Sequence, residues 1–162
     1  MRVVIRHAVS GSKQHNSVIR RVIYQAVKKI GFPRGVILSV SFIGDKKMYA
    51  LNQQYRQQNK TTNVLAFKTT PEYPKIPESL RIVRKIRVDP GIRGQRDLGD
   101  IFISYAEARR EAKQYGWTMR YEIARLTLHG FLHLLGYNHV KRGDAKAMEG
   151  LEKLILKNYV EH

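Results

Sequence analysis

The sequence contains no cysteine, so it can form neither a disulfide framework nor a thiolate metal site. Any bound metal ion must therefore be held by histidine, carboxylate or water. No apolar run reaches the ~20 residues that a membrane-spanning helix needs. The first residues, M-R-V-V-I-R-H, also lack the apolar stretch of a signal peptide. These absences predict a soluble, cytoplasmic protein with no membrane partner.

Acidic residues are scarce as well: 13 Asp and Glu stand against 30 Lys and Arg, for a formal net charge of +17. So basic a chain indicates a polyanionic partner, and nucleic acid is the leading candidate. The most one-sided segment runs from Arg81 to Arg96, where Asp89 is the only acid. We expect it to form a loop that contacts phosphates, with Arg81, Arg84, Lys85 and Arg87 as candidate contacts.

Length and hydrophobic periodicity predict a single domain over residues 1–162. Strands are expected at 2–7, 36–43, 64–68 and 98–104. Helices are expected at 17–30, 45–55, 104–116, 118–135 and from a cap near Asp144 onward, with Asp45 and Ser104 as N-caps of the second and third. The order of these elements predicts an α+β fold in which a small mixed sheet of about four strands packs against about five helices.

Three of the six histidines lie close together in the stretch H-G-F-L-H-L-L-G-Y-N-H. On a helix, His129 and His133 would share one face because they are four residues apart. Gly136 is suited to end that helix in a left-handed conformation, and the reversed chain would bring His139 back to the other two rings. Three imidazoles with one coordination position open are typical of catalytic zinc. We therefore predict one divalent metal ion here, with zinc favoured over nickel, cobalt or manganese.

The stretch is similar to the zinc-peptidase motif H-E-x-x-H-x-x-G-x-x-H, but Gly130 occupies the position of its glutamate. The general base of those peptidases is therefore missing. A metallopeptidase is one hypothesis for this chain, but Gly130 and the basic net charge argue against it.

The stretch also resembles the signature H-G-x-L-H-L-x-G-Y-D-H of the YbeY family of metal-dependent endoribonucleases. Two further blocks match in the same order: L-N-Q-Q-Y-R at 51–56 with T-N-V-L-A-F at 62–67, and L-G-D-I at 98–101. The resemblance implies the same α+β fold and single-strand-specific endoribonuclease activity in ribosomal RNA processing. It further implies a role in small-subunit maturation and ribosome quality control. The expected partners are ribosomal RNA, the small subunit, ribosomal proteins and assembly GTPases.

Carried over by position, the resemblance assigns the metal ligands to His129, His133 and His139, and an important arginine to Arg56. We take Arg56 and His133 as candidate catalytic residues. The metal would lower the pKa of water or polarise a phosphoryl oxygen, and Arg56 would hold the phosphate.

Other polar residues have two possible roles each. Asp100 could orient a ligand histidine or only cap the turn after Gly99, and Asn63 could contact RNA or satisfy local backbone groups.

The chain departs from the family pattern at Asn138, Ala66 and Lys68, where aspartate, serine and proline are usual. Asn138 matters most because an amide can hydrogen-bond but cannot act as a base at neutral pH. The alternative hypothesis is therefore an RNA-binding ribosome-assembly factor whose metal is structural or weakly catalytic.

Overall fold

The computed structural model describes residues 1–32, 35–69, 96–140 and 142–159. Most of the predicted phosphate-contacting loop is outside these ranges, including Arg81, Arg84, Lys85 and Arg87.

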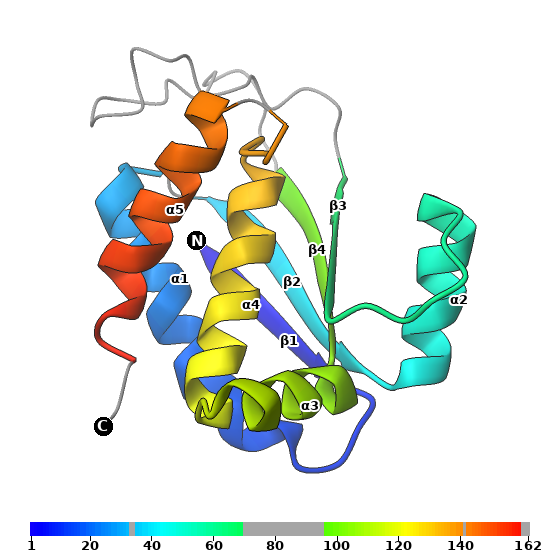
Figure 1. The fold of residues 1–162 in the computed structure, drawn as a ribbon. Coiled ribbons are helices and arrows are strands. Elements are labelled where there is room, and N and C mark those ends of the chain that lie inside the picture. Colours follow the sequence, from blue (N-terminus) through cyan, green and yellow to red (C-terminus); the bar gives the residue numbers. More distant parts are fainter. Residues whose placement is uncertain (33–34, 70–95, 141, 160–162) are drawn as a thin grey trace.

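In the described ranges, four strands form one mixed sheet in the order β1-β2-β4-β3 (Figure 1). They are β1 (Arg2–His7), β2 (Val36–Ile43), β3 (Val64–Lys68) and β4 (Arg96–Ser104). β1, β2 and β4 run parallel, whereas β3 is antiparallel to β4. All four strands were predicted, and the mixed α+β architecture is confirmed.

Five α-helices and one short 3-10 helix complete the described part of the chain. They are η1 (Ser12–His15), α1 (Asn16–Ile30), α2 (Asp45–Arg56), α3 (Tyr105–Tyr115), α4 (Met119–Leu134) and α5 (Arg142–Leu156). Figure 1 shows α1, α4 and α5 grouped together beside the sheet, while α2 lies apart from them beyond β3. The prediction missed η1, which directly precedes α1.

Helix α4 lies at the centre of the helical layer, in contact with α1, α3, α5 and the strands β3 and β4. Ile123, Leu126, Leu128, Phe131 and Leu132 are all fully buried, although they point in different directions around the helix. A helix that is apolar on most sides is stable only when neighbours cover it on most sides. The histidines of α4 are therefore carried by the most firmly packed helix of the domain.

The expected helix starts near Thr118 and Asp144 lie within two residues of the observed ones. Of the two N-caps that were predicted, Ser104 is correct and Asp45 is wrong. Ser104 caps α3, since its Oγ accepts a hydrogen bond from the Glu107 amide at 3.3 Å. Asp45 is not a cap: Gly44 takes that position in an extended conformation, and the Asp45 carboxylate accepts hydrogen bonds from Ser104 and Arg110. Asp144 lies inside the first turn of α5, which starts at Arg142.

Within the described ranges, the helices are all too short or too polar to cross a membrane.

Candidate metal centre

The end of α4 brings the three histidines together. The amide of Tyr137 donates to the Leu132 carbonyl at 3.1 Å, the amide of Gly136 donates to the His133 carbonyl at 3.0 Å, and Gly136 has φ 95°. This pair of bonds is the Schellman motif, which requires a left-handed residue and suits glycine. The chain therefore reverses after α4 as predicted. One ligand atom from each of His129, His133 and His139 lies within 4.8 Å of the others.

Two of the three imidazole rings are oriented by a hydrogen bond at the Nδ1 atom. His129 Nδ1 lies 2.9 Å from Glu152 Oε1, and His133 Nδ1 lies 2.9 Å from the Tyr137 carbonyl oxygen. A carbonyl oxygen can only accept a hydrogen bond, and so can the carboxylate of Glu152 when it is ionised. Each Nδ1 therefore carries a proton and donates it. The Nε2 atom of each neutral ring is then left with a lone pair available to a metal ion.

The two Nε2 atoms face each other at 2.9 Å. With both protons on Nδ1, two lone pairs would point at one another without a proton between them, and this contact is repulsive. A cation held by both nitrogens removes the repulsion. Burial, and next the neighbouring His129, lower the pKa of His133 and keep this ring in the neutral form that binds metal. The donor set therefore fits a divalent metal ion held by three imidazoles.

Gly130 lies between the two helical histidines and packs directly on the sheet. A Cβ atom at this position would lie 2.9 Å from Ile101 Cγ2, and Ile101 is fully buried in β4. A side chain there would require the Ile101 side chain or the helix to shift. A glutamate at residue 130, as in the zinc-peptidase motif, would be sterically unfavourable here, which argues further against a peptidase.

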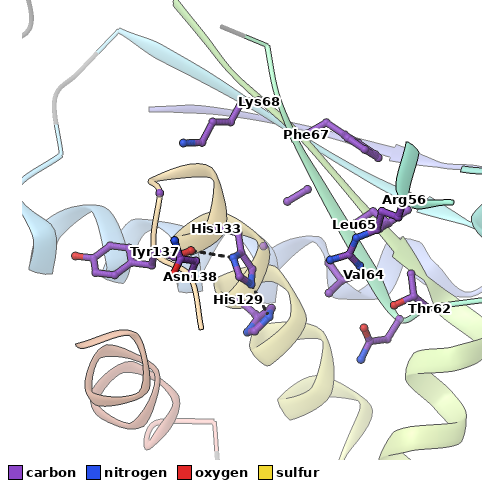
Figure 2. Close-up of a pocket in the computed structure, with 14 residues that line it drawn as sticks. Arg56, Thr62, Val64, Leu65, Phe67, Lys68, His129, His133, Tyr137 and Asn138 are labelled. Carbon is purple, nitrogen blue, oxygen red and sulfur yellow. Dashed lines mark hydrogen bonds between the residues drawn. The ribbon is translucent and has the colours of Figure 1, made fainter. Parts of the chain in front are cut away.

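His129 and His133 line one wall of a cleft with a volume of about 580 Å³. Figure 2 shows His129 and His133 on α4, with Arg56 facing them from beside β3. Arg56 is the last residue of α2 and is exposed. Its guanidinium makes no hydrogen bond or ion pair with any other described residue. The predicted arginine thus shares one cleft with two of the predicted metal ligands, although they come from segments far apart in the sequence.

Asn63 also lines this cleft, but its amide group is already engaged. Its Nδ2 donates to both carboxylate oxygens of Glu111 at 2.9 Å. Glu111 also pairs with Arg125 at 2.8 Å, and Arg125 in turn pairs with the buried Glu122. Asn63 is therefore part of a polar network that joins the cleft wall to α3 and α4. Only its Oδ1 is left for a ligand.

Asp100 does not reach the histidines. Its neighbour Ile101 faces α4, and because side chains alternate along a strand, Asp100 faces the opposite side of the sheet. There it lies 3.9 Å from Arg6 of β1. The hypothesis that Asp100 orients a ligand histidine is wrong for this structure. Gly99 is required for another reason: a Cβ there would lie 2.1 Å from the Phe67 carbonyl oxygen.

Asn138 supports the turn that carries His139. Its Oδ1 accepts a hydrogen bond from the Val140 amide at 3.1 Å, a short-range contact typical of asparagine and aspartate in turns. Asn138 lies on the cleft wall beside His133, so it can influence both the turn and the cleft (Figure 2).

The sequence prediction missed Glu152, the carboxylate that supports His129. Glu152 lies 23 residues from His129, on a different helix. Only the amphipathic pattern of α5 was available as a signal, and it does not say which neighbouring helix a given side chain meets.

Comparison with known proteins gives three results. The family model described as Endoribonuclease YbeY matches residues 5–160. The chain is 38% identical over 122 residues to a Staphylococcus carnosus protein named Endoribonuclease YbeY, covering 75% of this chain and 71% of the relative. It is 30% identical over 146 residues to the Lacticaseibacillus casei protein of the same name, covering 90% and 88%.

The fold is also similar to that of a solved protein. The solution structure of TM1509 from Thermotoga maritima superposes with a TM-score of 0.56 at 20% identity, covering 97% of this chain and 91% of that one. At this identity the likeness supports the fold alone.

Proposed function

The chain belongs to the YbeY endoribonuclease family, and from this premise we propose that it is a metal-dependent endoribonuclease that cleaves single-stranded ribosomal RNA. One observation carries the proposal: two of the three converging imidazoles, those of His129 and His133, line the same cleft as Arg56, which has no ion-pair partner among the described residues. Both features suit a hydrolase acting on phosphodiesters, because charge develops on the phosphoryl oxygens while water attacks phosphorus.

His129, His133 and His139 would hold the metal ion. When bound, a divalent ion at this position supplies Lewis acidity, which makes water a better nucleophile at neutral pH and withdraws charge from a phosphoryl oxygen. Glu152 and the Tyr137 carbonyl keep the rings of His129 and His133 in the tautomer that binds metal. Zinc is the proposed ion, since three neutral imidazoles with an open position suit it.

Arg56 would bind the scissile phosphate. A guanidinium is permanently charged and presents parallel N–H donors that match two phosphoryl oxygens. Two arginines of the helices α3 and α4 are engaged in internal pairs: Arg110 pairs with Asp45, and Arg125 pairs with Glu111. Arg56 has no such pair among the described residues, so binding a phosphate breaks no interaction with any of them.

The cleft wall would hold the rest of the substrate. Asn63 presents its Oδ1, which can accept a hydrogen bond from a ribose hydroxyl, while Lys68 adds a positive charge on β3. The absence of a side chain at Gly130 leaves α4 closely packed on β4, which holds the two helical histidines at a fixed height above the sheet.

The net charge of +17 supports a polynucleotide substrate. We propose that this substrate is ribosomal RNA, and that the protein acts in small-subunit maturation and ribosome quality control in the cytoplasm. Ribosomal proteins and assembly GTPases are the proposed protein partners.

The proposal can be tested with purified protein and a short single-stranded ribosomal RNA. We expect Arg56→Gln and His133→Ala each to reduce cleavage at least about 100-fold, while the dissociation constant for RNA changes much less. Lys47→Gln is the matched control, since Lys47 is an exposed cation on the same helix as Arg56. If RNA affinity falls in parallel with cleavage, or if neither variant cleaves less, the assembly-factor hypothesis is the better account.

A further inference from the structure

A second cavity lies at the other end of α4 from the metal centre. It has a volume of about 370 Å³ and is formed where η1 and α1 meet the start of α4 and the residues after α5. Its polar lining consists of Gln14, His15, Ser17, Arg21, Arg120 and Tyr159. No carboxylate belongs to the described lining, so two arginines are the only permanent charges there.

Tyr159 gives the clearest sign that this cavity is a binding site. The residue is fully buried, yet its hydroxyl group has no hydrogen-bond partner among the described residues. A buried hydroxyl without a partner is unfavourable, and native proteins rarely leave one. Burial raises the pKa of Tyr159, while the nearby charges of Arg21 and Arg120 oppose that rise. The hydroxyl is therefore close to both cations and available to donate to an acceptor in the cavity.

The start of α1 adds positive potential to the same place. Its first turn contains no acidic residue, and its N-cap makes no side-chain hydrogen bond. The N-terminus of a helix of this length favours an anion. Arg21, on the second turn of α1, is exposed and makes no hydrogen bond or ion pair within the described ranges. Its neighbour Arg20 differs, because Arg20 donates to the Val3 carbonyl at 2.9 Å.

The ligand must be rich in acceptors, negatively charged and small. A phosphate group meets these conditions, since it can accept from the Tyr159 hydroxyl, the Ser17 hydroxyl and a guanidinium at once. We propose that this cavity, formed by Arg21, Arg120, Tyr159 and the start of α1, is a phosphate-binding site separate from the metal centre. The source of the phosphate rests on the proposed function: if the protein cleaves RNA, the phosphate belongs to the backbone of the RNA substrate.

The first arm of the test uses inorganic phosphate and no RNA. The midpoint of thermal unfolding is compared in phosphate and in chloride at equal ionic strength for the full chain, Tyr159→Phe, Arg21→Gln and Lys29→Gln. Lys29 is the matched control because it is an exposed cation near the other end of α1. We expect phosphate to raise the midpoint of the full chain and of Lys29→Gln, and to raise that of the other two variants much less.

Tyr159→Phe also separates binding from folding. Because the hydroxyl has no partner among the described residues, its removal should leave the midpoint in chloride unchanged or higher. A loss confined to the phosphate condition is then a loss of binding. If Tyr159→Phe and Arg21→Gln respond to phosphate as Lys29→Gln does, the proposal is overturned.

The second arm identifies the source of the phosphate. Binding of single-stranded RNA is measured over a range of salt concentrations with each variant placed in the His133→Ala chain, which prevents cleavage. If RNA supplies the phosphate, Arg21→Gln should weaken binding and reduce the slope of log affinity against log salt by about 1 relative to Lys29→Gln. Equal slopes together with a lost phosphate response would support the site and assign it to a small phosphorylated molecule. Neither arm depends on cleavage, so a failure of the proposed activity would be seen separately.

Discussion

At the residue scale, the metal centre depends on two hydrogen bonds that lie behind the ligand rings. Glu152 and the Tyr137 carbonyl each accept from an Nδ1 atom, and so fix which nitrogen of His129 and His133 faces the cleft. The result is a pair of Nε2 atoms 2.9 Å apart, a contact that is unfavourable without a cation between them. Glu152 is therefore expected to contribute to metal affinity without touching the metal.

The variant Glu152→Gln tests this role. An amide can accept the same hydrogen bond, but it lacks the charge that makes the imidazole a stronger ligand, so we expect metal affinity to fall about 10- to 100-fold. Competition with a chromophoric chelator measures the effect. Glu149→Gln is the control, since Glu149 is an exposed acid of α5 that pairs with Lys153. Equal affinities of the two variants would show that Glu152 has no such role.

Asn138 provides a second prediction at this scale. The variant Asn138→Asp would keep an oxygen acceptor for the Val140 amide, so the turn and the metal content should be preserved. The added carboxylate can take up a proton beside His133, and we expect cleavage to increase several-fold. Single-turnover cleavage and metal analysis on the same sample measure both quantities. Equal rates for the two proteins would show that residue 138 takes no part in the chemistry.

At the element scale, local patterns in the sequence predicted the strands, the long helix and the turn at Gly136. These features are determined by periodicity and by one glycine, which act over a few residues. Asp100 and Glu152 could not be placed in this way. The face of β4 that meets α4, and the side of α5 that meets His129, are set by packing between distant segments. The cleft that joins Arg56 to the histidines likewise depends on strand order, which the sequence does not show directly.

The contact between α4 and β4 can be tested with two helical glycines. Gly130→Ala would place a Cβ 2.9 Å from Ile101 Cγ2, and we expect the free energy of unfolding to fall by about 1–3 kcal/mol. Gly150→Ala, on α5, has nothing within 4 Å of the new Cβ. There the greater helix propensity of alanine should raise stability by about 0.5–1 kcal/mol. Urea denaturation measures both changes.

The opposite signs of these two effects make the comparison informative. If Gly130→Ala stabilises the protein as Gly150→Ala does, α4 does not approach β4 as closely as described. Gly130→Ala should also weaken metal binding, because any shift of α4 away from Ile101 moves His129 and His133 with it.

At the scale of the whole molecule, two arginines without partners among the described residues lie at two different cavities. Arg56 lines the cleft of the histidines, and Arg21 lines the cavity at the start of α1. Several acids that the structure describes near these helices already pair with other cations. Positive charge is thus available at both cavities, which lie at opposite ends of α4.

Stability should depend on pH through the buried histidine His15. Burial lowers its pKa below the ordinary value of 6.5, so the unfolded chain binds a proton more readily than the folded chain does. The free energy of unfolding should therefore decrease as pH falls from about 7 to about 5. Denaturation of the metal-free protein at several pH values should give a smaller decrease for His15→Gln. Parallel curves would contradict this assignment.

The central claim is that the three histidines hold one metal ion on which RNA cleavage depends. Its most direct test is to titrate metal-free protein with zinc while following cleavage of a single-stranded ribosomal RNA. We predict no cleavage without metal, and activity that rises in proportion to zinc up to one equivalent per chain. His133→Ala should remain inactive throughout the titration. Full cleavage by the metal-free protein, or by His133→Ala, would contradict the account.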